Sequence, residues 1–222
     1  MIKAVIFDLD GTLLNTLDAL SYCMSMTMKH FGLGEIDKEH TRYFVGEGAR
    51  KFVERSLQYN GEKDPKMLVE AYNVYDEIFS RDCLRNVSPY EGIPKLLTEL
   101  KDRGIKLAVL SNKIQSGVEA NINKIIGRDV FDLIYGERTG VPRKPDPTAL
   151  NLLMEELGVS NNEVLYVGDT ATDMLTAEAA DCLSVGALWG YRDEKELREN
   201  NANFIIKTPM EIIEIVDKIN KL

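Results

Sequence analysis

Six short apolar segments alternate with segments of helical periodicity, and this alternation constrains the fold more than any other feature. The apolar segments cover residues 2–7, 106–110, 131–135, 164–167, 183–185 and 204–206. Runs this short and this apolar are typical of strands that are buried on both faces. Strands that alternate with helices form a mostly parallel sheet with helices on both sides. The sequence therefore predicts an α/β fold with a Rossmann-like sheet.

Residues 17–85 interrupt this alternation, because they show helical periodicity and no convincing strand. Within them, Asp64 followed by Pro65 is typical of a helix start, with a capping side chain and a proline at the first helical position. The segment follows the first predicted strand and is long enough, at roughly 70 residues, to pack as a small bundle. We therefore predict an α/β core over residues 1–15 and 86–222, and an inserted all-helical cap domain over residues 16–85.

Composition argues against several classes of partner. The net charge of −9 over 222 residues provides no basic surface for nucleic acid or for an anionic membrane. We see no run that is apolar enough to span a bilayer and no cleavable signal pattern at the start. The three scattered cysteines fit free thiols in a reducing compartment. His30 and His40 lie outside any acid cluster, which argues against a zinc site or a histidine-based triad. We predict a cytoplasmic protein, monomer or homodimer, with a small-molecule partner.

Polar side chains follow three of the predicted strands. They are Asp8 and Asp10, Ser111 and Asn112, and Asp169 and Asp173. Right-handed crossovers bring the carboxyl ends of parallel strands to one edge of the sheet, where ligands bind in such folds. Lys144 lies in a loop at the same edge. Taken alone, the Asp-x-Asp-Gly segment is also common in turns. A calcium loop is ruled out, because its fifth and sixth positions are Thr12 and Leu13 instead of an acid and glycine.

These side chains together suit phosphoryl transfer. Carboxylate oxygens favour a hard cation such as Mg²⁺, and Asp169 and Asp173 are one helical turn apart, so they can face one ion. The Ser111 hydroxyl, the Lys144 ammonium and the turn amides after Asp8 are suited to hold phosphate oxygens. The set supplies a carboxylate nucleophile, a metal site and a second carboxylate for proton transfer. It therefore indicates a reaction through an aspartyl-phosphate.

Four motifs occur in order at compatible strand ends. They are residues 8–12 (DLDGT), 111–113 (SNK), 144–147 (KPDP) and 168–173 (GDTATD). With these motifs the sequence resembles the haloacid dehalogenase superfamily, in its phosphatase branch, over essentially the whole chain. The predicted helical segment lies where that family has its helical cap. Residues 45–49 and 186–192 resemble the corresponding segments of the phosphoglycolate phosphatase subgroup.

The resemblance implies a role for each motif residue. Asp8 would attack phosphorus and bind Mg²⁺. Asp10 would protonate the leaving group, then activate water, and its main-chain carbonyl would bind the metal. Asp169 would be a direct metal ligand, and Asp173 would bind the metal directly or through water. Ser111 and Lys144 would hold the transferring phosphoryl group.

Further substrate contacts are predicted at the turn and in the cap. The backbone at Gly11, Thr12 and Asn112 is expected to approach the phosphoryl group. Arg50 and Lys51 on a cap helix are candidates to meet a substrate carboxylate, although a solvated helix face explains them equally well. Lys113 is expected to face solvent.

The leading functional prediction is a Mg²⁺-dependent phosphatase of small phosphorylated metabolites, with 2-phosphoglycolate as the best single candidate. The alternative is a sugar phosphomutase or an inorganic pyrophosphatase that uses the same residues. A non-catalytic binding protein on this fold is disfavoured, because the nucleophile, acid, lysine and metal acids are all present.

Overall fold

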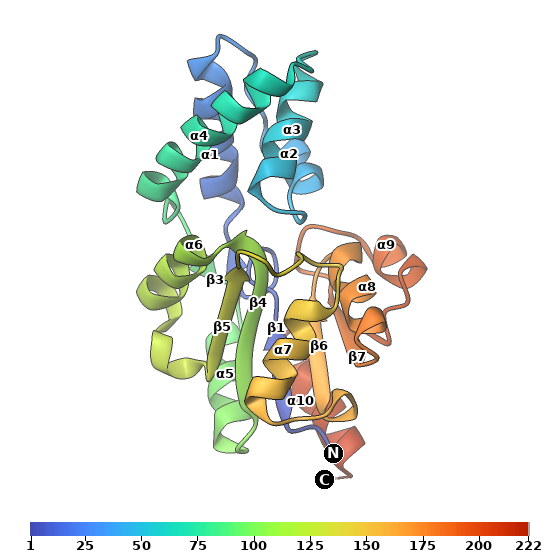
Figure 1. The fold of residues 1–222 in the computed structure, drawn as a ribbon. Helices are drawn as coiled ribbons and strands as arrows, with labels where there is room; N and C mark the ends of the chain where they lie inside the picture. Colours follow the sequence, from blue (N-terminus) through green and yellow to red (C-terminus); the bar gives the residue numbers. More distant parts are fainter. Residues whose placement is uncertain (222) are drawn as a thin grey trace.

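A six-stranded parallel sheet forms the centre of the computed structural model, which describes residues 1–221 (Figure 1). Its strand order is β5-β4-β1-β6-β7-β8, so β1 lies between β4 and β6. The strands are β1 (Ala4–Phe7), β4 (Lys106–Ile114), β5 (Leu133–Glu137), β6 (Val164–Gly168), β7 (Leu183–Ala187) and β8 (Phe204–Ile206). All six predicted strands are confirmed, and so is the predicted α/β fold class.

Helices cover both faces of the sheet. Val5 and Phe7 of β1 point to one face and Ala4 and Ile6 to the other, because neighbouring residues of a strand alternate. The first pair packs in a core with α5 (Ile93–Asp102), α6 (Gln115–Asn121) and α10 (Glu211–Asn220). The second pair packs with α7 (Thr148–Leu157) and α8 (Ala171–Ala179). The other helical elements outside residues 16–85 are η1 (Ile122–Ile126), η2 (Arg128–Val130), η3 (Asn161–Glu163) and α9 (Glu194–Glu199).

Four further helices lie together beyond the carboxyl ends of the strands (Figure 1). They are α1 (Leu17–His30), α2 (Lys38–Phe44), α3 (Ala49–Tyr59) and α4 (Pro65–Asp82). They share a separate apolar cluster that includes Met24, Phe52 and Tyr75. The Asp64 side chain accepts a hydrogen bond from the Lys66 amide, which confirms the predicted helix start. We propose these helices as the cap that the sequence places between residues 16 and 85.

A short antiparallel ribbon joins the helical segment to the rest of the chain. Its strands are β2 (Leu14–Asn15) and β3 (Ser88–Pro89), with Leu14 opposite Pro89 and Asn15 opposite Ser88. The chain therefore leaves and re-enters the core at one place. None of the helices within residues 1–221 has both the length and the apolar character needed to cross a membrane.

Strand β4 is longer than predicted. The apolar pattern ends at Leu110, but the strand runs to Ile114, and its pairing with β5 shifts register between these two residues. Such an irregularity re-aims side chains near the end of a strand. Ser111, Asn112 and Lys113 therefore belong to the strand itself, although the sequence pattern places them after its end.

Candidate active site

Asp8 lies at the carboxyl end of the central strand. Its amide donates to the Val167 carbonyl of β6 over 2.8 Å, which fixes the backbone just before the chain turns away. Gly11 has a φ of +87°, a conformation that favours glycine. A Cβ atom at Gly11 would lie 2.2 Å from Oδ2 of Asp169. The glycine therefore allows the turn and also lets the backbone lie directly against a second acidic side chain.

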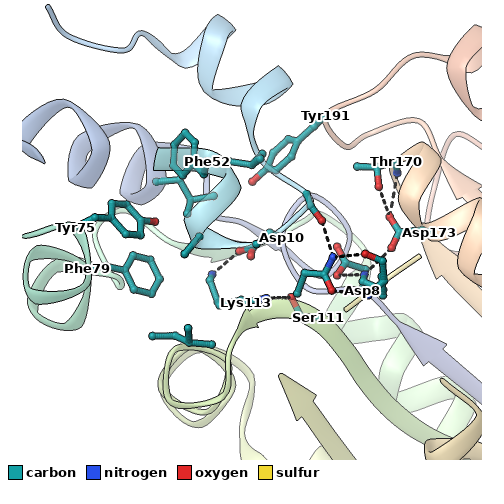
Figure 2. Close-up of a pocket in the computed structure, with 18 of the residues that line it drawn as sticks. Asp8, Asp10, Phe52, Tyr75, Phe79, Ser111, Lys113, Thr170, Asp173 and Tyr191 are labelled. Carbon is teal, nitrogen blue, oxygen red and sulfur yellow. Dashed lines mark hydrogen bonds and ion pairs between the residues drawn. The ribbon is translucent and has the colours of Figure 1, made fainter. Parts of the chain in front are cut away.

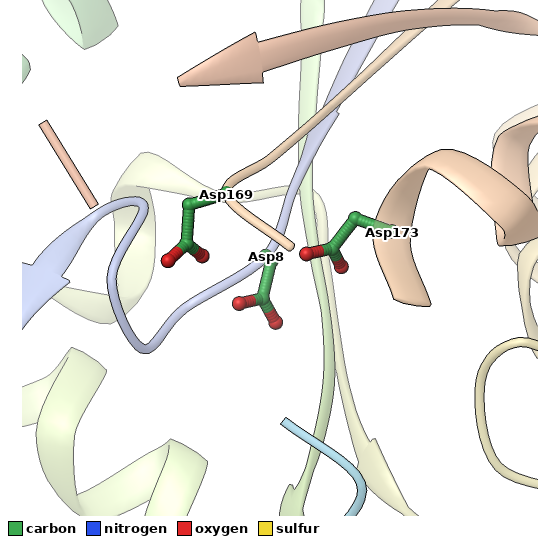
Figure 3. Close-up of side chains that lie close together, drawn as sticks. All are labelled: Asp8, Asp169 and Asp173. Atoms are coloured by element: carbon green, nitrogen blue, oxygen red, sulfur yellow. The ribbon is translucent and has the colours of Figure 1, made fainter. Parts of the chain in front are cut away.

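Three carboxylates gather at this point: Asp8, Asp169 and Asp173 (Figure 3). Each offers one oxygen that lies within 4.8 Å of the others, and all three are buried. Asp169 accepts hydrogen bonds from the Thr12 hydroxyl (3.0 Å) and the Tyr191 amide (2.7 Å). In the first turn of α8, Oδ2 of Asp173 accepts from the Thr170 amide and hydroxyl. The cluster is thus held in place by its own neighbours.

The cluster carries more negative charge than its surroundings balance. Burial raises the pKa of Asp8 to about 7, and repulsion from Asp173 and Asp10 adds to this effect, while Lys144 opposes it. Burial, followed by repulsion from Asp173 and Asp8, raises the pKa of Asp169 well above its usual range. Buried carboxylates of this kind are stabilised by a bound cation. The oxygen-only donor set therefore fits a divalent metal ion.

Lys144 reaches into the same cluster. Its Nζ atom lies 2.8 Å from Oδ1 of Asp8, 2.7 Å from Oδ1 of Asp173 and 2.9 Å from the Tyr166 hydroxyl. The residue is only 5% exposed. Burial lowers the pKa of Lys144, but attraction to Asp173 and Asp8 outweighs that effect and raises the pKa well above its usual value. A charged ammonium group therefore lies beside the candidate nucleophile.

Asp10 is held through one of its two carboxylate oxygens. Its Oδ1 atom accepts from the Thr16 hydroxyl (2.6 Å) and from Nζ of Lys113 (2.5 Å). The Thr16 hydroxyl also lies 2.9 Å from the Tyr191 hydroxyl. The expectation that Lys113 faces solvent is wrong, because this residue is only 8% exposed and its ammonium contacts Asp10. The shifted register of β4, which the sequence does not show, turns Lys113 inward.

Ser111 and Asn112 are both buried next to this group. The Ser111 hydroxyl accepts from the Lys113 amide over 3.3 Å. The Asn112 side-chain amide donates to the carbonyls of Gly46 and Lys144, both over 3.0 Å. Its Oδ1 atom accepts from the Lys144 amide over 2.9 Å. Asn112 therefore joins the loop before α3 to the loop that carries Lys144, while the backbone contact predicted for it stays a prediction.

These residues line a pocket of about 60 Å³ between the sheet edge and the helical segment (Figure 2). The wall opposite Asp8 is largely apolar and comes mainly from the helical segment, through Leu20, Val45, Ala49, Phe52, Tyr75 and Phe79. The sequence did not identify this wall, because its side chains recur at the same helical spacing as core residues. Thr170 and Tyr191 also line the pocket and were missed, although Thr170 lies in the fourth motif and Tyr191 in the segment 186–192 that resembles the phosphoglycolate phosphatase subgroup.

Three residues predicted to contact the substrate have other surroundings in the structure. Arg50 is exposed on α3, and Lys51 forms an ion pair with Glu54 at 2.8 Å. Neither residue lines the pocket, so their role toward a substrate stays a prediction. The Thr12 side chain is fully buried and bonds to Asp169. The Thr12 amide donates to the Leu9 carbonyl over 3.3 Å, and the Thr12 carbonyl accepts from the Trp189 indole over 3.0 Å, so the phosphoryl contact predicted for its backbone stays a prediction.

Comparison with known proteins assigns the sequence to a family. The family model for haloacid dehalogenase-like hydrolases matches residues 5–187. The phosphoglycolate phosphatases of Aquifex aeolicus and Vibrio cholerae are each 30% identical over 219 residues, with 97% of both chains covered.

Solved structures agree with this assignment. A proposed phosphoglycolate phosphatase from Lactobacillus delbrueckii is 27% identical, with a TM-score of 0.91 over 96% of this chain and 98% of that one. CbbY of Rhodobacter sphaeroides, solved with xylulose-(1,5)bisphosphate, has the same fold, with a TM-score of 0.80 at 24% identity over 95% and 96% of the two chains.

The chain therefore belongs to the haloacid dehalogenase-like hydrolase family. Within that family it is a phosphatase, similar over nearly its whole length to phosphoglycolate phosphatases.

Proposed function

We propose that this phosphatase hydrolyses small phosphate monoesters through an aspartyl-phosphate on Asp8, with Mg²⁺ as its metal and 2-phosphoglycolate as its main substrate. One observation carries the proposal: a strand-end carboxylate, two further buried acids and a charged lysine meet at the base of one pocket. A cytoplasmic location and a monomeric or dimeric state stay predictions.

The first half-reaction transfers the phosphoryl group to the protein. A carboxylate oxygen of Asp8 attacks phosphorus, and the bond between phosphorus and the leaving-group oxygen breaks. Lys144 and Ser111 hold phosphoryl oxygens, and the side chains of Asp8, Asp169 and Asp173 with the Asp10 carbonyl would hold Mg²⁺. When bound, Mg²⁺ neutralises negative charge between the nucleophile and the phosphoryl oxygens.

Asp10 moves the proton in this proposal. Its Oδ1 atom is occupied by Thr16 and Lys113, which leaves Oδ2 for the leaving-group oxygen. Asp10 donates its proton to that oxygen and then, as a carboxylate, takes a proton from water. The water attacks phosphorus, the bond to Asp8 breaks, and inorganic phosphate is released with Asp8 restored.

Pocket size and polarity support a compact substrate. The whole pocket, including the space next to Asp8, Ser111 and Lys144, has a volume of about 60 Å³, which is room for only a few water-sized groups. Its apolar wall offers few hydrogen-bond partners for the hydroxyl groups of a sugar. Together with the names of the relatives, this favours 2-phosphoglycolate over the larger hexose phosphates.

The test is phosphate release from 2-phosphoglycolate, pyrophosphate and hexose 1-phosphates, with and without Mg²⁺. We expect 2-phosphoglycolate to react fastest and only with Mg²⁺. Asp8→Asn should lower its rate by at least about 10⁴-fold, because the nucleophile is lost. Asp102→Asn, an exposed substitution on α5, serves as the matched control and should leave the rate unchanged.

Each part of the proposal has its own contrary outcome. Undiminished release by Asp8→Asn would remove the aspartyl-phosphate mechanism. Equal rates across the panel would keep that mechanism and remove 2-phosphoglycolate as the main substrate. Isomerisation of a hexose 1-phosphate without net phosphate release would instead identify a phosphomutase.

A further inference from the structure

Lys113 lines the pocket, yet the phosphoryl chemistry assigns it no substrate contact. Its ammonium group has three N–H donors. Within the described part of the chain it donates to two acceptors, Oδ1 of Asp10 at 2.5 Å and Oδ1 of Asn121 at 2.9 Å. One N–H is therefore open to a ligand.

The position of Lys113 matches that of a leaving group. Its ammonium lies beside Asp10, which faces the leaving-group oxygen, and 5.4 Å from the centre of the Phe79 ring (Figure 2). It thus stands between the phosphoryl site and the apolar wall of the helical segment. Lys144 is the other lysine of the lining, and it is already bound to Asp8 and Asp173.

The surroundings of Lys113 favour an anion over a neutral group. The Lys113 side chain is only 5% exposed and its ammonium lies near the Phe79 ring, and attraction between charges is stronger where water is excluded. Asp10 is the one acidic side chain bonded to Lys113 among the described residues, and the same Asp10 oxygen also accepts from the Thr16 hydroxyl. Asp76 also lines the pocket but is exposed to solvent, which weakens its repulsion of an anion.

We propose that Lys113 binds a carboxylate on the leaving group, so that the site selects short phosphorylated hydroxy acids over neutral phosphate esters. The inference rests on the proposed function and deepens it by naming the substrate class. It also assigns the recognition of the substrate carboxylate to a residue of β4, in place of the exposed Arg50 and the paired Lys51 of α3.

A matched pair of substrates tests this proposal. The pair is 2-phosphoglycolate and its amide, which has the same shape but no charge on the leaving group. We expect Lys113→Met to lower the ratio of kcat/KM for 2-phosphoglycolate to kcat/KM for its amide by about 10- to 100-fold. This is the loss expected for a hydrogen bond to a charged group. Any effect of the substitution on Asp10 cancels in this ratio, because both substrates need that acid equally.

Two further variants sharpen the test. Lys113→Arg keeps the charge and should restore part of the ratio. Lys106→Met removes a lysine from the opposite end of the same strand, outside the pocket, and should leave the ratio unchanged. If Lys113→Met fails to fold, Lys113→Gln removes the same charge and retains a polar side chain.

Equal losses for both substrates would show that Lys113 acts only through Asp10, and no loss for either substrate would show that Lys113 makes no contact, so either result overturns the proposal. Calorimetric binding of both compounds to Asp8→Asn, with and without Lys113→Met, decides the question apart from turnover. A preference for 2-phosphoglycolate that is lost with Lys113 would support the carboxylate contact even if the proposed reaction failed. No preference in Asp8→Asn would contradict it.

Discussion

Glycines let the acidic side chains lie directly against the backbone. A Cβ atom at Gly168 would lie 2.3 Å from Cβ of Asp173, and one at Gly190 would lie 2.3 Å from Cβ of Asp169. Real Cβ atoms do not approach other atoms so closely, and a close-packed site cannot absorb the extra volume without moving. These glycines therefore fix where the two carboxylates stand relative to Asp8.

Gly190→Ala should displace Asp169 and weaken metal binding. Changes in groups that position metal ligands typically cost 10- to 100-fold in affinity or activity. We expect the Mg²⁺ concentration for half-maximal phosphate release to rise by at least about tenfold, as measured by a Mg²⁺ titration. Gly34→Ala is the control, since its Cβ would meet only Oδ1 of Asn60 in an exposed contact. An unchanged Mg²⁺ requirement in Gly190→Ala would show that Asp169 tolerates the displacement.

At the scale of elements, the end of β4 connects two loops. The Asn112 side chain donates to the Gly46 carbonyl in the loop before α3. It also exchanges two hydrogen bonds with the backbone of Lys144 in the second loop. The position of the helical segment and the position of Lys144 are thus linked by a single side chain.

Asn112→Ala should lower both stability and activity. It leaves the buried Lys144 amide without its acceptor, which costs about 1–3 kcal/mol. We expect a lower urea midpoint and a reduced kcat/KM for 2-phosphoglycolate, because Lys144 is less firmly held. Ser184→Ala, which removes a buried hydroxyl outside the pocket lining, controls for stability alone. Equal kinetic effects in the two variants would mean that Asn112 has only a structural role.

The elements also show what the sequence can predict. Periodicity identified all six strands, and capping chemistry identified the start of α4, because both depend on neighbouring residues. The extension of β4 past Leu110 was missed, since it depends on pairing with β5 after a register shift. The inward position of Lys113 and the apolar wall around Phe79 depend on packing between distant segments, which local pattern does not record.

At the scale of the whole molecule, the acidic cluster makes stability depend on pH. The pKa of Asp8 is raised from its usual value near 4 to about 7, so the folded chain binds more protons than the unfolded chain between these values. Without metal, this contribution to stability is present at low pH and is lost as pH rises through about 7.

Mg²⁺ should therefore stabilise the protein more at about pH 8 than at about pH 5, because the ion binds the ionised carboxylates. Thermal melts with and without Mg²⁺ at both pH values measure this difference. Asp8→Asn should reduce the pH dependence, since one titrating group is gone. An equal increase in Tm at both pH values would mean that the ion binds away from the cluster.

The ribbon formed by β2 and β3 bears on how such a molecule diversifies. Asn15 and Ser88 are partners in this ribbon, so the two ends of the helical segment are neighbours in space. A segment whose ends lie this close can be exchanged for another without stretching the chain that leaves β1 or the chain that enters α5. The nucleophile, the acids and Lys144 all come from outside that segment, and most of the apolar wall comes from within it. Exchange of the helical segment at this ribbon could therefore give the same catalytic residues a different range of substrates.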